Sequence, residues 1–247
     1  MKKLWLLLIF LPLFTFAQDD MAKKMTYWFI NKNINDFLQN KVSNLDNSIP
    51  TVTAEALIQD YKDNQLSYEE KYDEAIVRIQ DVVAGIKTTV MKQAYLQVKG
   101  KNNFESISLY VDRTDKNILS LKKGDKIDMV CMGTNNNVIY PRLMDCDFTV
   151  NYSKKLKAMN QEYIEYLATK KMKAKYLIGG FYQAFCKILQ INDKLNETIK
   201  SAPDFDKSMQ KFKFNQELIN LTFSMVASDY SEQELNKMPW FILPTIK

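Results

Sequence analysis

The chain has 247 residues, of which 46% are hydrophobic, so it can build one large domain or two small ones, and it is neither disordered nor membrane-embedded throughout. It contains no histidine, and therefore lacks the side chain most often used as a metal ligand or as a general acid or base. Its formal net charge of +5 is a modest basic balance that does not by itself indicate nucleic acid binding.

Residues 1–17 have the three parts of a secretory signal peptide. A lysine pair precedes an apolar run from Leu4 to about Phe14, and the segment ends at Ala17. The apolar run is shorter than the roughly 20 residues that a membrane-spanning helix needs. We therefore expect cleavage after Ala17, export to the periplasm or the medium, and no transmembrane segment in the mature protein. The alternative is an N-terminal anchor that is retained.

Residues 18–50 are predicted to form an N-terminal helix followed by a linker. Asp19 or Asp20 would cap a helix over residues 19–47, on which the large apolar side chains fall roughly on one face. The pattern loosens at residues 31–35, where we expect the helix to break.

The region 51–150 begins with helical patterns and then alternates. Thr53 is a suitable N-cap for an amphipathic helix, and a second short helix follows it. Between residues 75 and 148, apolar and polar side chains alternate in four to five short runs, which is the pattern of strands, with a bend near Asp81. Strands of this length and spacing, led by an amphipathic helix, indicate a small closed or half-closed barrel.

The region 151–247 has a helical period throughout. Apolar residues recur at steps of three and four along 177–195 and 205–226, which predicts two antiparallel helices. A capping box at Ser231 predicts a last short helix, and the apolar segment 240–243 is expected to pack back onto a neighbour.

The central region also resembles a known family. The residues that carry the resemblance, in chain order, are Ala54 with Leu57, Tyr61 with Asn64, Lys71-Tyr72, Val83 with Ile86, Tyr95–Val98, Leu121–Asp125 and Leu143–Cys146. With this order and spacing, residues 53–148 resemble the OB-fold domains of the tRNA_anti-like family, exported bacterial proteins named for their similarity to anticodon-binding barrels.

Two positions depart from the family pattern. Asp81 stands where the family usually has glycine in the first strand, and a Gly-x-Cys-x-Gly motif survives only as Cys131-Met132-Gly133. For residues 53–148 the resemblance implies an OB-fold barrel. Together with the helical patterns on either side, we expect an α+β fold in which a five-stranded OB-fold β-barrel is preceded by a helix and followed by an antiparallel helical region. The resemblance implies no established enzymatic activity, cofactor or ligand.

Tyr95 and Tyr110 are the leading candidates for a ligand-binding face. A hairpin that turns at residues 101–104 places them opposite each other on the second and third strands, where OB-folds stack bases or sugars. Lys99 on the same face and Arg113 at its edge would add positive charge. We favour a cross-strand aromatic pair covered by a flanking helix. A third interpretation is a pair of exposed tyrosines at the surface that binds a protein partner.

The cysteines and lysines allow further interpretations. Cys131 and Cys146 are a candidate disulfide, although a turn centred near residues 135–136 would place Cys131 opposite residue 140 instead. Cys186 is interpreted as a small buried hydrophobe. A lysine cluster without arginine is interpreted as a solvated helix face rather than as a site for anionic lipid, glycan or phosphate: Lys154, Lys155, Lys157, Lys170, Lys171, Lys173 and Lys175.

No catalytic motif is evident in the sequence. It contains no P-loop, dinucleotide fingerprint, zinc-ligand spacing or nucleophile elbow, and we expect no metal or cofactor. The leading hypothesis is therefore an exported, non-catalytic binding or adaptor protein of the cell envelope, with a protein or a glycan as partner. The alternatives are nucleic acid binding through the barrel and, last, an enzyme that uses carboxylates.

Overall fold

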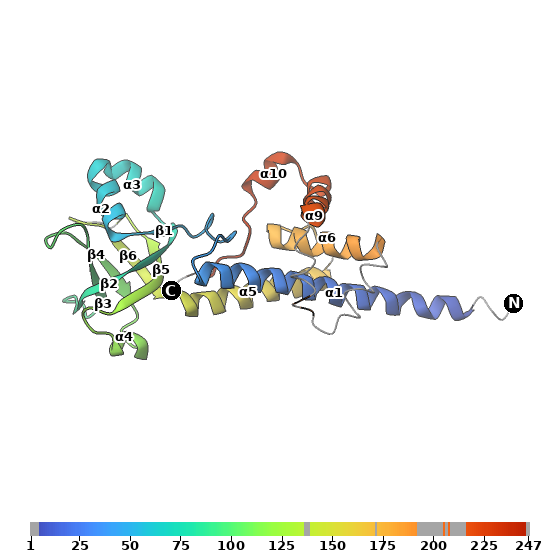
Figure 1. The fold of residues 1–247 in the computed structure, drawn as a ribbon, viewed down its shortest axis with the longest axis horizontal. Helices are drawn as coiled ribbons and strands as arrows, with labels where there is room; N and C mark the ends of the chain where they lie inside the picture. The colour runs from blue at the N-terminus through green and yellow to red at the C-terminus, as the bar shows by residue number, and fades with distance from the viewer. Residues whose placement is uncertain are drawn as a thin grey trace. The chain divides into compact units, whose positions relative to one another are not determined.

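The computed structural model describes residues 5–135, 139–170, 172–191, 205, 207 and 216–245 (Figure 1). The chain divides into two compact units. The barrel unit contains Asp36–Lys155 and Pro244–Lys247, and the helical unit contains Met1–Asn35 and Leu156–Leu243.

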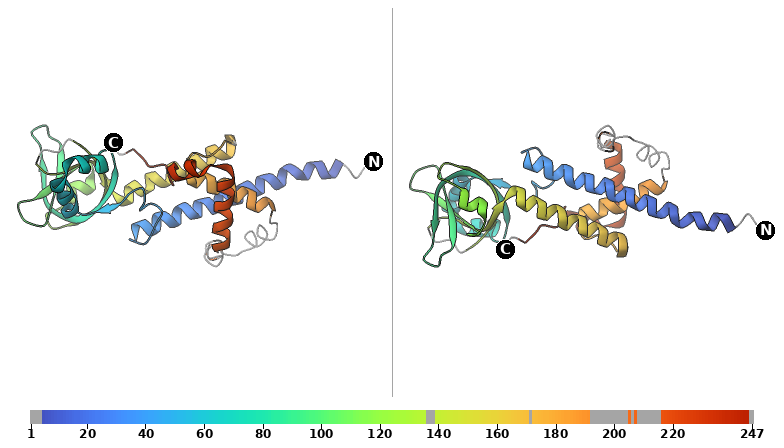
Figure 2. Two further views of the ribbon diagram at one scale, coloured as in Figure 1. Left: turned by 90° about the horizontal axis from the view of Figure 1, so that it is seen from above. Right: turned by 90° about the horizontal axis from the view of Figure 1, so that it is seen from below.

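The barrel unit is built on a six-stranded sheet with the order β1-β2-β3-β4-β6-β5, and β2 also pairs with β5. Its strands are β1 (Thr51–Val52), β2 (Ile76–Thr88), β3 (Ala94–Lys99), β4 (Ser106–Val111), β5 (Lys126–Gly133) and β6 (Arg142–Phe148). The additional pairing closes the last five strands into a barrel, which Figure 2 shows as a ring, while β1 adds in parallel to β2. Only β4 and β6 are parallel within the barrel. The predicted α+β fold with a five-stranded OB-fold barrel is confirmed.

Alternating side chains of β3 and β4 supply much of the barrel core. Leu96, Val98, Ile107 and Leu109 are fully buried, whereas the residues between them remain partly exposed. Burial of each such side chain stabilises the fold by about 1.5–3 kcal/mol. The core therefore fixes which side chains of the hairpin point outward.

The long strand β2 is shared between two partners. It pairs with β5 as far as Val82 and with β3 from Val83 onward, with a register shift between Val83 and Gly85. Asp81 itself pairs regularly with Ile127, so the bulge or bend predicted near Asp81 is present a few residues further along the strand.

Three short helices belong to the barrel unit: α2 (Ala54–Asp63), α3 (Gln65–Tyr72) and α4 (Lys116–Ser120). The predicted N-cap is confirmed, because the Thr53 side chain accepts a hydrogen bond from the backbone N–H of Ala56. α4 was not predicted. Asp115 is its N-cap, and the Asp115 carboxylate accepts a hydrogen bond from the backbone N–H of Asn117.

A buried ion pair lies on the outer side of β2, where the alternating pattern predicts exposure. Arg78 is 1% exposed and donates through Nε to Asp128 at 2.7 Å and through Nη1 to the carbonyl of Phe37 at 2.5 Å. Thr149 and Gln80 also donate to the Asp128 carboxylate. The end of the N-terminal helix covers this part of the sheet, and this is why an outward-facing position is buried.

The helices of the helical unit are α1 (Trp5–Leu38), α5 (Thr149–Lys170), α6 (Leu177–Ile191), α9 (Gln216–Asp229) and α10 (Glu232–Lys237). The boundary between the two units falls within α1 and within α5. Within the described residues, no helix combines the length and the hydropathy that a membrane span requires.

α1 differs from its prediction at both ends. It is continuous through Asp19, Asp20 and residues 31–35, so neither the predicted N-cap nor the predicted break is present. It ends at Leu38 rather than near residue 47, because Asn40 adopts a positive φ of 55° and the N–H of Lys41 donates to the carbonyl of Asp36. This is a Schellman motif with asparagine in the left-handed position.

The C-terminal segment folds back within the helical unit, as predicted. The N–H groups of Leu177 and Ile178 donate to the carbonyls of Pro239 and Trp240, and Phe241 is buried. The predicted pairing of α6 with a following helix is seen in the contact of α6 with α9. The predicted connection at residues 201–204 lies outside the described residues.

The short helix α10 begins as its sequence predicts. Ser231 and Glu234 form the reciprocal hydrogen bonds of a capping box. This motif satisfies two of the backbone N–H groups that a helix start leaves unpaired.

Candidate functional site

Tyr95 on β3 and Tyr110 on β4 form an aromatic pair on the outside of the barrel. They are direct cross-strand neighbours, and their ring centroids lie 5.6 Å apart with an angle of 32° between the ring planes. Both side chains are half-buried, whereas Ala94 and Leu96 on either side of Tyr95 point into the core. The pair therefore presents two tilted rings side by side at the surface.

Polar side chains continue this surface along the same strands. Gln97 lies opposite Ser108, and Lys99 lies opposite Ser106. The Gln97 side-chain amide donates to Ser106 Oγ at 2.7 Å, which fixes the amide against the sheet. Directly opposite residues share one side of a sheet, so we define the Tyr95 face as the outward side chains of β2, β3 and β4: Lys87, Tyr95, Gln97, Lys99, Ser106, Ser108 and Tyr110.

Glycine leaves one position of this face without a side chain. Gly85 lies opposite Gln97 on the neighbouring strand, and a Cβ atom there would approach Gln97 Oε1 to 3.4 Å. The Gln97 side chain therefore packs against the backbone at Gly85.

The two predicted cations lie at opposite ends of the hairpin. Lys99 is exposed at the turn end of β3 and donates to Asn103 Oδ1 at 2.5 Å. Arg113 lies beyond the end of β4, where its Nη1 donates to the backbone carbonyl of Lys92 at 3.2 Å. The structure thus places Lys99 on the Tyr95 face and Arg113 at the rim of a hollow next to it.

This hollow, which we call the barrel-end hollow, has a volume of about 700 Å³. That volume falls within the range of about 300–1,000 Å³ typical of small-molecule sites. Tyr110 and Arg113 line it together with apolar residues such as Ala94, Ile118 and Met129. The hollow is therefore a second place where the barrel could hold a ligand.

Two of the carboxylates that line the hollow are already engaged. Asp147 pairs with Lys155 at 2.8 Å and accepts from the amide of Asn151. Hydrogen bonds from the hydroxyl and the backbone N–H of Thr114 lower the pKa of Asp112. A carboxylate with a lowered pKa is not suited to act as a general acid near neutral pH.

The structure joins Cys131 and Cys146 in a disulfide between β5 and β6. The expected obstacle, a turn that would place Cys131 opposite residue 140, does not occur. The connection is longer than assumed, so Met132 pairs with Met144 and a register shift follows between Val130 and Met132.

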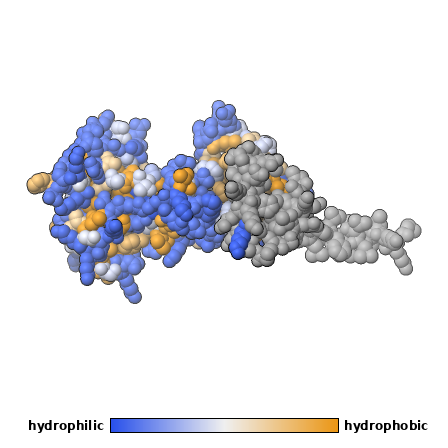
Figure 3. Space-filling view, viewed as in Figure 1, coloured by the Kyte–Doolittle hydropathy of each residue, from blue (hydrophilic) through white to orange (hydrophobic). Residues whose placement is uncertain are grey.

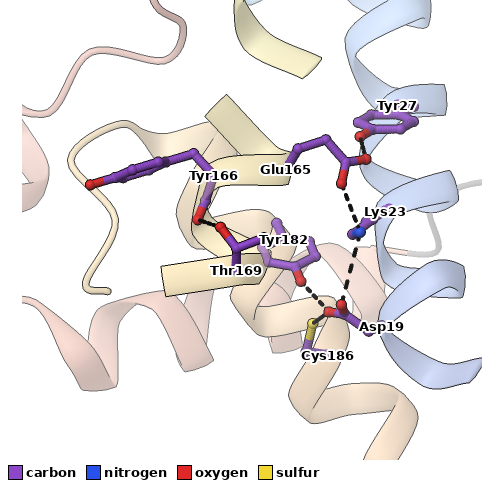
Figure 4. A network of polar contacts seen from close by, with 8 residues as sticks. All are labelled: Asp19, Lys23, Tyr27, Glu165, Tyr166, Thr169, Tyr182 and Cys186. Atoms are coloured by element: carbon purple, nitrogen blue, oxygen red, sulfur yellow. Dashed lines mark hydrogen bonds and ion pairs between the residues drawn. The ribbon is translucent and has the colours of Figure 1, made fainter. Parts of the chain in front are cut away.

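A separate polar network joins helices of the helical unit (Figure 4). Lys23 on α1 donates to Glu165 on α5 at 2.8 Å and lies 4.0 Å from Asp19. Hydrogen bonds from Lys23 and Tyr27 lower the pKa of Glu165. Sequence analysis missed this network because its partners lie 142 residues apart in the chain.

The same network contains the remaining cysteine. The carboxylate of Asp19 accepts from the hydroxyl of Tyr182, and the thiol of Cys186 lies 3.8 Å from it (Figure 4). Burial raises the pKa of the Cys186 thiol to about 11. The thiol therefore stays protonated at neutral pH and is a poor nucleophile.

The lysine cluster is partly neutralised. Lys155 pairs with Asp147, and Lys173 pairs with Glu234 at 3.1 Å. Lys171 lies outside the described residues. Within the part of the chain that the structure describes, no group of three or more His, Cys, Asp or Glu side chains could hold a metal ion.

Comparisons with known proteins bear on the family of the chain. The model of the family described as tRNA_anti-like matches residues 1–147. A crystal structure from Klebsiella pneumoniae subsp. pneumoniae MGH 78578, described as that of a candidate nucleic acid-binding lipoprotein, is 14% identical with a TM-score of 0.34. That match covers 41% of this chain and 92% of the other. A search among curated proteins found no match.

Proposed function

We propose, for a chain that belongs to the tRNA_anti-like family, the function of an exported, non-catalytic binding protein of the cell envelope that holds a glycan on the Tyr95 face. The observation that carries this proposal is the pair Tyr95–Tyr110, with ring centroids 5.6 Å apart on adjacent strands of an OB-fold barrel. These are the strands on which OB-folds bind oligosaccharides and oligonucleotides.

The chemistry around the tyrosine pair suits a sugar. An aromatic ring offers an apolar surface to the C–H face of a sugar, and neutral amide and hydroxyl groups exchange hydrogen bonds with its hydroxyls. Gln97, Ser106 and Ser108 provide such groups next to the rings.

The side chains of the barrel support binding rather than catalysis. The sequence has no histidine, and Asp112 in the barrel-end hollow has a lowered pKa. A catalytic acid needs a pKa near the working pH. Histidine, which would have such a pKa, is missing, and the pKa of Asp112 is shifted away from that range.

Export is supported by two features of the chain. Residues 1–17 have the pattern of a signal peptide, and the Cys131–Cys146 disulfide suits an oxidising compartment. Mass spectrometry of the protein from its native host should find Gln18 as the first residue, in the envelope or medium fraction. A chain that retains Met1 in the cytoplasmic fraction contradicts export.

Calorimetric titration with a soluble N-acetylglucosamine tetrasaccharide tests the glycan. Each of Tyr95→Ala and Tyr110→Ala should weaken binding by about ten- to a hundredfold, since loss of one stacking ring costs about 1–3 kcal/mol. Tyr166→Ala removes a tyrosine that is 47% exposed on α5 and serves as the matched control, with unchanged affinity. Equal losses in all three variants contradict the assignment of the face.

Nucleic acid is the second candidate ligand. It is favoured by Lys87, which lies directly opposite Tyr95, and by Lys99 on the same face. Binding of a single-stranded oligothymidine that weakens steeply with salt, and that both tyrosine substitutions abolish, would support it. Absence of binding at low salt removes this candidate.

A further inference from the structure

Two charged residues that line the barrel-end hollow have backbone conformations that favour glycine. Four non-glycine residues in the described part of the chain have a positive φ, namely Asn40, Glu74, Lys92 and Asp145. The last two line the same hollow. They carry opposite charges.

Lys92 occupies the glycine position of a tight hairpin loop between β2 and β3. The N–H of Lys92 donates to the carbonyl of Thr89, the N–H of Thr89 donates to the carbonyl of Gln93, and φ of Lys92 is 61°. This is a type I turn followed by a left-handed residue, a loop in which glycine or asparagine is preferred because a Cβ atom strains the left-handed conformation.

Asp145 occupies the corresponding position of a bulge in β6. Leu143 pairs with Leu109 and Cys146 pairs with Val111, so two residues of β6 lie opposite one residue of β4. The φ of Asp145 is 51°, and glycine is the residue that such a bulge usually takes. Aspartate tolerates this conformation better than most residues, so the strain is smaller here than at Lys92. A charged side chain is therefore present at a second position that glycine usually takes.

Neither charge is used to stabilise the fold. The Lys92 ammonium and the Asp145 carboxylate form no hydrogen bond or ion pair with any residue that the structure describes. Residues whose backbone is held in a sparsely populated conformation cluster at ligand sites. Arg113 adds a further positive charge next to Lys92, because its Nη1 is held by the Lys92 carbonyl. Its other N–H groups form no hydrogen bond with the described residues and can bind an anion.

We propose that the barrel-end hollow binds a small zwitterion, with its amino group on Asp145 and its carboxylate on Lys92 and Arg113. The apolar side chains of Ala94, Ile118 and Met129 line the space between and suit a short aliphatic body. A volume of about 700 Å³ accommodates a molecule of the size of an amino acid or a dipeptide. This site adjoins the Tyr95 face, with which it shares Tyr110, but Tyr95 itself does not line the hollow.

The test uses the full chain and probes that differ only in charge. 6-Aminohexanoate and the dipeptide Ala-Leu should bind, and 6-aminohexanoate should bind at least about tenfold more tightly than hexanoate or hexylamine. Asp145→Asn, which keeps a side chain tolerant of positive φ, and Arg113→Gln should each weaken the zwitterions by at least about tenfold. Tyr95→Ala should leave their affinity unchanged, which separates this site from the glycan face.

Two outcomes overturn the proposal. One is the absence of binding of either zwitterion at millimolar concentration, and the other is equal binding of hexanoate and 6-aminohexanoate. A stability measurement checks the reasoning independently. Lys92→Gly should raise the melting temperature by about 2–4 °C, because glycine relieves the strain, and Asp145→Gly should raise it less, because aspartate tolerates a positive φ. Both variants should lose zwitterion binding. A lower melting temperature in both variants would show that the side chains are structural.

Discussion

Replacing Asp128 by alanine leaves the guanidinium of Arg78, which is almost fully buried, without its main acceptor. Arg78 is 1% exposed, and two of its nitrogens, Nε and Nη2, donate to the Asp128 carboxylate. Only the bond from Nη1 to the carbonyl of Phe37 would remain. A buried charge that loses its partner destabilises a protein by about 3–5 kcal/mol.

The reverse substitution should cost less. Arg78→Met removes the charge and keeps most of the side-chain volume, and Asp128 retains donors in Thr149 and Gln80. The Asp128 side chain is also 36% exposed, so water can solvate its charge. We expect a loss of about 1–3 kcal/mol for Arg78→Met. The predicted asymmetry follows from the different exposure of the two partners.

Amide hydrogen exchange of the central residues of β5 measures this difference within the barrel unit alone. Asp128→Ala should speed exchange by about a hundredfold or more, since 1.4 kcal/mol corresponds to a factor of ten. Lys71→Met breaks an exposed pair with Asp60 and should change exchange by less than about fivefold. Equal effects of Asp128→Ala and Arg78→Met, or an effect of Asp128→Ala no larger than that of the control, would refute the reasoning.

Three further predictions concern the barrel unit. Burial raises the pKa of Asp128, but its hydrogen bonds outweigh burial and hold that pKa below the usual value. The stabilisation that Asp128 provides should therefore persist above about pH 4 and fade as the pH drops through the folded-state pKa. If thermal melts show that the destabilisation by Asp128→Asn grows below pH 4, this prediction is wrong. Replacing Cys131 and Cys146 by alanine should cost about 3 kcal/mol in urea unfolding, as expected for a loop of 15 residues, and a wild-type protein insensitive to reductant would argue against it. Gly133→Ala places a Cβ atom 1.8 Å from the backbone oxygen that ends α3, so it should lower the melting temperature sharply, whereas Gly85→Ala should be nearly neutral; similar melting temperatures for both variants would contradict the close approach.

The sequence was most informative where neighbouring residues decide the structure. The alternation along 93–99 and 107–111 was enough to predict the β3–β4 hairpin, and the turn position was enough to place Tyr95 opposite Tyr110. Local hydrogen bonds likewise made the caps at Thr53 and Ser231 predictable.

Features that depend on distant contacts could not be predicted in this way. Arg78 has an outward position in β2, and the end of α1 at Phe37, which is distant in the sequence, packs over it. The positive φ of Lys92 leaves no signal in the sequence, because lysine does not favour that conformation, and a single aspartate at residue 145 is not enough to place a bulge. The register that brings Cys146 to Cys131 could not be derived from a simple turn either, because the pairing of β5 with β6 shifts between Val130 and Met132.

The most direct test of the Tyr95 face is an amide chemical-shift map of the protein with the N-acetylglucosamine tetrasaccharide. The account predicts the largest shifts at the backbone amides of Tyr95, Gln97, Ser108 and Tyr110, with saturation at the affinity found by calorimetry. Shifts confined to residues outside β2, β3 and β4, with these four amides unmoved at saturation, would contradict it.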